Sequence, residues 1–288
     1  MNTVLSIGAD ALAYAMVLFI ICIGLSVTMG LMKVVNLAHG AFAMIGGYIA
    51  SYSIQQLGLS FGIGIAAAIC GTIIIAIPLE RLLYRRIYGA SELTQVLMTI
   101  GITFIIIGLA NLFFGPTLKT IPLPDWLQGG VDIGFRSIAA HKLLSIAVGL
   151  AVALTLRFAL ERTMFGIRLR ASVDDAPMAA ALGVRTEWVY AISFILAVGL
   201  AALGGVIGAQ LLPIEPYYAL RYMVLFLVVV SVGGTSGTIG GALLACLILG
   251  TVETSARYLV PEYGEFFFYL AVIAIVAVFP NDIQRLVR

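Results

Sequence analysis

This sequence has few charged residues. Only 10% of its 288 residues are Asp, Glu, Lys or Arg, against about 25% in an ordinary soluble domain. The few charges stand in short clusters, and long apolar runs separate them. Hydrophobic residues make up 62% of the chain and the mean hydropathy is +1.12. This composition excludes a soluble globular domain and predicts a protein that works across or inside a membrane.

The apolar runs have the length of membrane helices, which need about 20 mostly apolar residues. Eight runs qualify and one is shorter: 10–32, 36–56, 62–80, 92–114, 141–160, 188–211, 238–256 and 265–281, with 222–232 as the short one. The runs are too long for barrel strands and do not alternate. The sequence predicts an all-α membrane protein, a polytopic helical bundle of 8–9 transmembrane spans. We expect a single transmembrane domain over residues 1–288, with broken or short helices at glycine-rich turns.

Acidic residues are missing from the middle of every predicted span, where ion-coupled transporters usually bury them. A phosphate-binding loop of the G-x-x-x-x-G-K-[ST] type is missing too, because each of the three lysines follows a residue other than glycine. The three cysteines lack metal-ligand spacing. We therefore expect no catalytic residue, no metal and no cofactor in this chain. If the protein moves a solute uphill, we expect the energy to come from another chain.

Positive charges predict the orientation, since Lys and Arg are enriched in cytoplasmic loops. One cluster follows the third run, one surrounds the loop after the fifth, and one ends the chain: Arg81, Arg85 and Arg86; Arg157, Arg162, Arg168, Arg170 and Arg185; Arg285 and Arg288. Two spans separate the first two clusters, so both can face the cytoplasm. The loop 116–140 then faces outward and the N-terminus lies outside. A cytoplasmic C-terminus requires that 222–232 count as a crossing, which favours nine passes.

Two glycine-rich hairpins join apolar runs, at 30–47 and at 233–241. Irregular backbone at membrane depth survives only against protein or a water-filled cavity, and breaks in paired positions point to a transport pathway. We expect the pathway to be lined by Asn36, His39, Gly40, Thr99, Thr235, Ser236 and Gly237. The alternative is that both hairpins are ordinary turns, with Asn36 and His39 in buried hydrogen bonds that fix helix packing.

Two shorter patterns also stand out in the sequence. Ala197, Ala201, Gly205 and Ala209 recur every four residues and predict a close helix seam, either within the chain or against a second subunit. The quartet at 234–237 has the G-x-S-G form of rhomboid-type intramembrane proteases, which use a later histidine as base. Both histidines of this chain precede Ser236, so the enzyme alternative departs from that pattern.

The segment 161–187 forms the largest loop on the predicted cytoplasmic side. Asp175 suits a helix cap, Pro177 a first turn and Gly183 a helix stop. They enclose a short apolar helix over 178–182, which is too short to be stable alone in water. Such a helix must pack on something, either a partner's groove or the protein's own membrane face.

Three segments of the chain resemble the permease subunits of ATP-binding-cassette (ABC) importers for branched-chain amino acids, the leucine/isoleucine/valine type. Asn36-Leu-Ala-His39-Gly40 resembles their N-[FL]-A-H-G signature. The run from Gly166-Ile-Arg-Leu-Arg-Ala through Ala179-Ala-Ala-Leu-Gly183 resembles their coupling loop, and Val232-Gly-Gly through Ile239-Gly-Gly-Ala resembles their C-terminal signature. The resemblance covers nearly the whole chain, whose length is similar to the shorter, H-type permease.

The resemblance implies a multi-pass protein of the bacterial inner membrane that imports branched-chain or other small neutral amino acids by alternating access. Implied partners are a longer homologous permease, two cytoplasmic ATPases that hold ATP and Mg, and a periplasmic or extracellular solute-binding protein, with no nucleic acid. The implied contacts with an ATPase are Asp174, Asp175, Met178, Ala179, Ala180 and Gly183. Pro177 and Met178 stand where many such loops carry Glu. The alternatives are a urea or short-amide importer permease and a stand-alone channel or uniporter.

Overall fold

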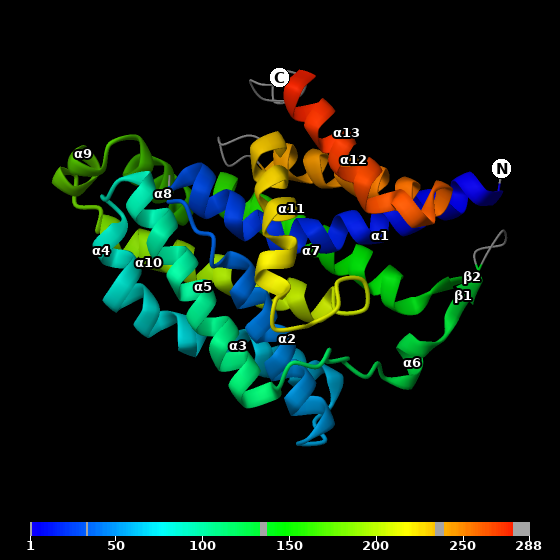
Figure 1. Ribbon diagram of the computed structural model, residues 1–288. Helices are drawn as coiled ribbons and strands as arrows, with labels where there is room; N and C mark the ends of the chain where they lie inside the picture. The colour runs from blue at the N-terminus through cyan, green and yellow to red at the C-terminus, as the bar shows by residue number, and fades with distance from the viewer. Residues whose placement is uncertain (1, 33, 133–136, 234–238, 279–288) are drawn as a thin grey trace.

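The protein is a bundle of helices (Figure 1). A computed structural model describes residues 2–32, 34–132, 137–233 and 239–278. The first half contains α1 (Asn2–Leu25), the π-helix η1 (Ser26–Leu31), α2 (His39–Gln55), α3 (Phe61–Leu79), the π-helix η2 (Glu80–Tyr84), α4 (Arg85–Ile87), α5 (Glu92–Phe114), α6 (Asp125–Gln128), β1 (Gly130–Asp132) and β2 (Ser137–Ala139). The second half contains α7 (Ala140–Arg162), α8 (Met164–Asp174), α9 (Ala176–Ala181), α10 (Thr186–Ile207), α11 (Tyr218–Gly233), α12 (Ile239–Leu259), the 3-10 turn η3 (Pro261–Tyr263) and α13 (Gly264–Val278).

In the part of the chain that the structure describes, each apolar run predicted from the sequence lies mainly on a helix, so an all-α membrane protein is confirmed. Within the described residues, six helical stretches are long and apolar enough to cross a membrane: Leu5–Gly30, Phe61–Ile87, Glu92–Phe114, Ala140–Arg162, Thr186–Ile207 and Ile239–Leu259. The helices α2, α11 and α13 have 17, 16 and 15 residues and are shorter than a full span. Helix length therefore supports six spans, and the predicted count of eight or nine stays a prediction.

Helix α1 is the centre of the bundle. It packs against α12, α10 and α7, and Phe19 and Ile20 on it are completely buried. Peripheral helices show the opposite pattern: Leu112 on α5 is 76% exposed and Leu154 on α7 is 69% exposed. Large apolar side chains that face outward are stable only against lipid or another apolar surface, so these faces mark the outside of the bundle in the membrane.

The seam of small residues lies within the chain, between α10 and the pair α1 and α2. A Cβ atom at Gly24 would stand 2.6 Å from the carbonyl oxygen of Ala197, and one at Gly46 would stand 2.6 Å from the Cα of Ala202. Backbone atoms cannot move aside as a flexible side chain can. The glycines are therefore needed for the close helix approach, and the alternative of a seam against a second subunit is not required.

The helices α4, α8 and α9 lie at one end of the bundle, and the N-terminus, α6 and the β1–β2 hairpin lie at the other (Figure 1). The first two arginine clusters thus share one end, as predicted, and we call it the arginine end. The third cluster, Arg285 and Arg288, lies outside the described residues.

Two loops contain more structure than the sequence analysis expected. The segment 161–187, expected to be a loop around one short helix, also includes the helix α8, and one face of α8 buries Leu169 completely. In the loop 116–140, β1 and β2 pair antiparallel with Val131 opposite Ile138.

Candidate functional site

The chain is irregular between α1 and α2. The helix α1 passes into the π-helix η1, a wider turn that is rare and often found at functional sites. Regular structure then stops until α2 begins at His39. The amide of Val34 bonds back to the carbonyl of Thr28 at 3.0 Å. We call residues 34–38 the α1–α2 break.

Two side chains of α5 accept hydrogen bonds from backbone amides of the break. The amide of Val35 donates to Gln95 Oε1 at 2.8 Å, and the amide of Leu37 donates to Thr99 Oγ1 at 3.2 Å. Gln95 Nε2 donates in turn to the carbonyl of Ile87 at 3.1 Å, which ties the break to α4. These bonds replace the backbone hydrogen bonds that a continuous helix would make. They are needed because an unpaired backbone group in a bilayer costs several kcal/mol.

Asn36 and His39 are each 1% exposed and each makes a defined hydrogen bond. Asn36 Oδ1 accepts from the amide of Ala38 at 3.1 Å and from the hydroxyl of Tyr84 at 2.9 Å. His39 Nε2 lies 2.8 Å from the carbonyl oxygen of Ile21. A carbonyl only accepts, so the proton is on Nε2 and the Nδ1 of the neutral ring is an acceptor. Asn36 Nδ2 and His39 Nδ1 are buried without a partner among the described residues.

The break brings together four of the residues predicted to line a pathway: Asn36, His39, Gly40 and Thr99. Gly40 lies against α11, where an added Cβ would come within 3.3 Å of the Cα of Ala219. Asn36, His39 and Thr99 are 0–1% exposed, so the break is closed in this conformation. In this conformation Asn36 and His39 form buried hydrogen bonds. Their role in a pathway stays a prediction.

Thr235, Ser236 and Gly237 lie outside the described residues. The first described residue after them, Ile239 at the start of α12, packs against a small cluster of buried side chains. This cluster, which we call the α8 cluster, consists of Val27, Met32, Val34, Leu160, Leu169 and Val189. Ile239 therefore packs against the same cluster that contains Val34 of the first hairpin.

Sequence analysis missed Gln95 and Tyr84, which hold the break in place. One local signal was available: Gln95 stands one helical turn before Thr99 in a largely apolar span, so the two share a face. The bond from Tyr84 to Asn36 spans 48 positions, and no local pattern announces it.

The second part of the candidate site is α9 at the arginine end (Figure 1). The carboxylate of Asp175 accepts from the amide of Met178 at 2.9 Å, so Asp175 caps the helix as predicted. The stop is confirmed as well: Gly183 has φ +87°, and the amide of Val184 donates to the carbonyl of Ala179 at 3.0 Å. The helix begins at Ala176 and ends at Ala181, slightly earlier than expected.

The short helix presents apolar side chains outward. Met178 is 57% exposed and Leu182 is 78% exposed, whereas Ala179 is 3% exposed and faces the protein. Asp174 ends α8, and both it and Ala180 are exposed. The structure therefore combines both alternatives for this helix, with one side resting on its own chain and the other uncovered.

The helix α8 connects α9 to the α1–α2 break. It follows Arg162 and packs against α7, α10 and η1. Its buried Leu169 belongs to the α8 cluster together with Val27 and Val34, which flank or form the break. The hydroxyl of Tyr190 on α10 donates to the carbonyl of Ser172 at 2.6 Å. Packed atoms therefore connect α9 to the break.

These features define a multi-pass membrane protein. Residues 8–276 match the family described as the permease component of the branched-chain amino acid transport system. The chain belongs to this family, and the resemblance drawn from its three motifs is confirmed.

Several characterised proteins are similar to the chain. It is 29% identical over 280 residues to the high-affinity branched-chain amino acid transport system permease protein LivH of Salmonella typhimurium, across 92% of this chain and 90% of that protein. It is 28% identical over 246 residues to the corresponding permease protein BraD of Pseudomonas aeruginosa, across 81% and 80%. The autoinducer 2 import system permease protein LsrC of Salmonella paratyphi B shares 32% identity over 139 residues, across 45% and 40%. No solved structure matches the chain.

Proposed function

We propose that this chain is the permease subunit of an ABC importer of the bacterial inner membrane that moves branched-chain or other small neutral amino acids into the cytoplasm. Membership of the permease family carries the proposal. Its partners are a longer homologous permease, two cytoplasmic ATPases and an external solute-binding protein. ATP and Mg bind to the ATPases, and this chain supplies the passage.

Coupling runs from α9 to the α1–α2 break. The exposed Met178 and Leu182 dock into an ATPase, and closure of the two ATPases moves α9 with α8. The α8 cluster carries this movement to Val34, at the start of the break. The bundle then exchanges an outward opening for an inward one.

The opening exposes polar atoms that are closed off in the conformation described here. Asn36 Nδ2 is a donor and His39 Nδ1 an acceptor, and both are buried without a partner among the described residues. Together they suit the carboxylate and the ammonium of an amino acid that passes through. A path without formal charge also suits apolar side chains and leaves selection to the binding protein.

The arginine end faces the cytoplasm, the N-terminus lies outside, and the chain crosses nine times. The positive charges at one end support this orientation. The short helix α2 begins beside Ile21 of α1 and ends at Gln55, whose amide donates to the carbonyl of Thr120 on the far side of the bundle. The 17-residue helix α2 therefore crosses back to the other side of the bundle after the chain turns at the α1–α2 break.

Reconstitution tests the function as a whole. The chain is purified with its neighbouring subunits, placed in liposomes, and assayed for uptake of leucine and for leucine-stimulated ATP hydrolysis. The proposal expects ATP-dependent uptake by the complex and none by the chain alone. Conductance or uptake by the chain alone would instead identify a channel or uniporter, and stimulation by urea but not leucine would identify a short-amide importer.

The pathway residues are tested in the same liposomes. Asn36→Ala and His39→Ala should each reduce uptake per folded, ATPase-bound complex, with the amount of folded complex measured for each variant. Thr251→Ala is the matched control, because its hydroxyl donates only to the carbonyl of Leu247 on its own helix and it is exposed. Unchanged uptake in both variants contradicts a role for the break in the pathway.

A further inference from the structure

A cavity of about 550 Å³ opens at the arginine end, between the end of α3 and the start of α10. It is separate from both the α1–α2 break and α9. Its lining consists of Ile77, Glu80, Arg81, Arg85, Glu187, Trp188, Ala191 and Ile195. The volume falls within the range of about 300–1,000 Å³ that is usual for small-molecule sites.

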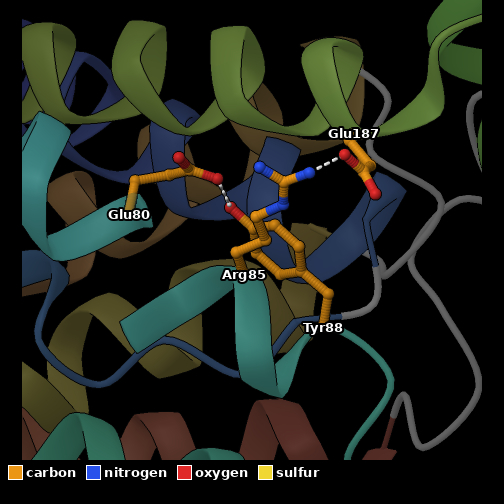
Figure 2. Close-up of polar contacts among 4 residues, drawn as sticks. All are labelled: Glu80, Arg85, Tyr88 and Glu187. Atoms are coloured by element: carbon orange, nitrogen blue, oxygen red, sulfur yellow. Dashed lines mark hydrogen bonds and ion pairs between the residues drawn. The ribbon is translucent and has the colours of Figure 1, made fainter. Parts of the chain in front are cut away.

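Figure 2 shows the polar contacts beside the cavity, which join Glu80 to Tyr88 and Arg85 to Glu187. Arg85 on α4 forms an ion pair with Glu187 on α10. Glu80 is 4% exposed, and its Oε1 accepts from the hydroxyl of Tyr88 at 3.1 Å. Burial, and then the charge of Glu80, raise the pKa of Tyr88, so its hydroxyl keeps the proton that it donates.

Glu80 and Arg81 are the two charges of the cavity that lack an ionic partner among the described residues. They are neighbours in the chain and line the same space. A carboxylate buried from water is stable only when a positive group or several donors face it. The cavity therefore fits a ligand that carries one ammonium and one anionic group.

The remaining lining is apolar and leads away from the charges along both helices. Ile77 lies on α3, and Ala191 and Ile195 lie on α10. Beyond them Ile74 is 67% exposed and Leu196 is 47% exposed, so the apolar surface continues along the outside of the bundle. Trp188, 56% exposed, stands at the charged end, where indole rings favour the boundary between headgroups and hydrocarbon. A charged end followed by an apolar groove has the shape of a phospholipid.

We propose that this cavity binds a phospholipid whose zwitterionic headgroup carries a primary ammonium, as in phosphatidylethanolamine. Arg81 binds the phosphate, Glu80 accepts from the ammonium, and an acyl chain lies along Ile77 and Ile195. Phosphatidylglycerol offers no ammonium to Glu80. Phosphatidylcholine carries a trimethylammonium without N–H donors. The charges of the cavity therefore favour the ethanolamine lipid over both.

Native mass spectrometry of the delipidated transporter complex tests this assignment. Phosphatidylethanolamine, phosphatidylcholine and phosphatidylglycerol with identical acyl chains are added separately and the bound lipids counted. The ethanolamine lipid should bind about tenfold more tightly than either of the others, since a hydrogen bond to a charged group is worth about that factor or more. Equal binding of the three lipids overturns the proposal, and this comparison needs no variant.

Two variants locate the site. Glu80→Gln keeps an acceptor for Tyr88 and removes the charge, and Arg81→Gln removes the phosphate ligand; each should lower ethanolamine lipid binding about tenfold. Glu161→Gln is the matched control, because Glu161 is an exposed carboxylate on α7 near the same end, paired with Arg157 at 3.2 Å. Equal loss in all three variants, or no loss in the first two, overturns the assignment. So does displacement of the lipid by millimolar leucine, which would make the cavity an amino-acid site.

Discussion

The α1–α2 break and the helix α9 are both short interruptions of the helical bundle, and they are stabilised in opposite ways. The break is closed off from solvent, and its polar groups depend on side chains from α5 and η2, such as Gln95 and Tyr84. The helix α9 depends on its own cap, Asp175, and on its own stop, Gly183. The break is therefore held by residues distant in the sequence, whereas the ends of α9 are set by residues of its own segment.

Because of this difference, the stability of the subunit and its coupling to an ATPase can be tested by separate substitutions. Substitutions around the break should lower the stability of the subunit, because buried groups lose partners or space. Substitutions on the outer side of α9 should leave the subunit folded and affect only what binds there. The four changes below test this separation, from the largest expected loss of stability to the smallest.

Gly24→Val should have the largest effect. Its Cβ would stand 2.6 Å from the carbonyl oxygen of Ala197 and 3.0 Å from His39 Cε1, so α1 and α10 must separate. We expect a loss of about 3 kcal/mol or more and a sharp drop in folded protein. Size-exclusion chromatography and the thermal midpoint measure it. Gly101→Val on α5, where nothing lies within 4 Å, is the control and should be nearly neutral.

Gln95→Leu should have the next largest effect. It removes the acceptor of the Val35 amide and the donor to the carbonyl of Ile87. A buried amide without a partner costs about 1–3 kcal/mol, so the thermal midpoint should fall and uptake with it. Thr103→Val is the control, since its hydroxyl bonds only to a carbonyl of its own helix. Equal midpoints in the two variants would show that the break does not need α5.

Asp175→Ala should have a smaller and local effect. Loss of a helix cap costs about 1 kcal/mol, and here the cost falls on α9 alone. Amide hydrogen exchange of residues 176–182 should become faster while the thermal midpoint of the subunit hardly changes. Leucine-stimulated ATP hydrolysis should fall a few-fold. Asp175→Ser keeps an accepting oxygen and should restore most of both; failure of this rescue would contradict capping as the cause.

Leu182→Asp, alone or with Met178→Asp, should cost the subunit almost no stability, within about 0.5 kcal/mol, because both side chains are exposed. It should nevertheless abolish capture of the ATPases in a pull-down and leucine-stimulated hydrolysis. Leu118→Asp, 52% exposed in the loop before α6, is the control and should retain both. Normal capture by the α9 variants would place the ATPase contact elsewhere.

Much of the candidate site was predictable where the information is local. The helix α9 was expected from Asp175, Pro177 and Gly183, because a cap, a first-turn proline and a left-handed glycine act within a few residues. The helix α8 was missed, because its arginines hide an apolar face that becomes visible only when Leu169 is packed. The segment that contains Asn36 and His39 was recognised as irregular, but the partners that hold it were not.

By itself the sequence determined that the chain lies in a membrane, where its long apolar helices fall, that the first two arginine clusters share an end, and that a short capped helix lies near 178–182. Each of these depends on composition or on neighbours in the chain. Only the tertiary structure decided that the small-residue seam is internal, that Gln95 and Tyr84 hold the α1–α2 break, and that Glu80 and Arg81 face one cavity. Such contacts join residues that are tens of positions apart, and their energy exists only once the helices have packed.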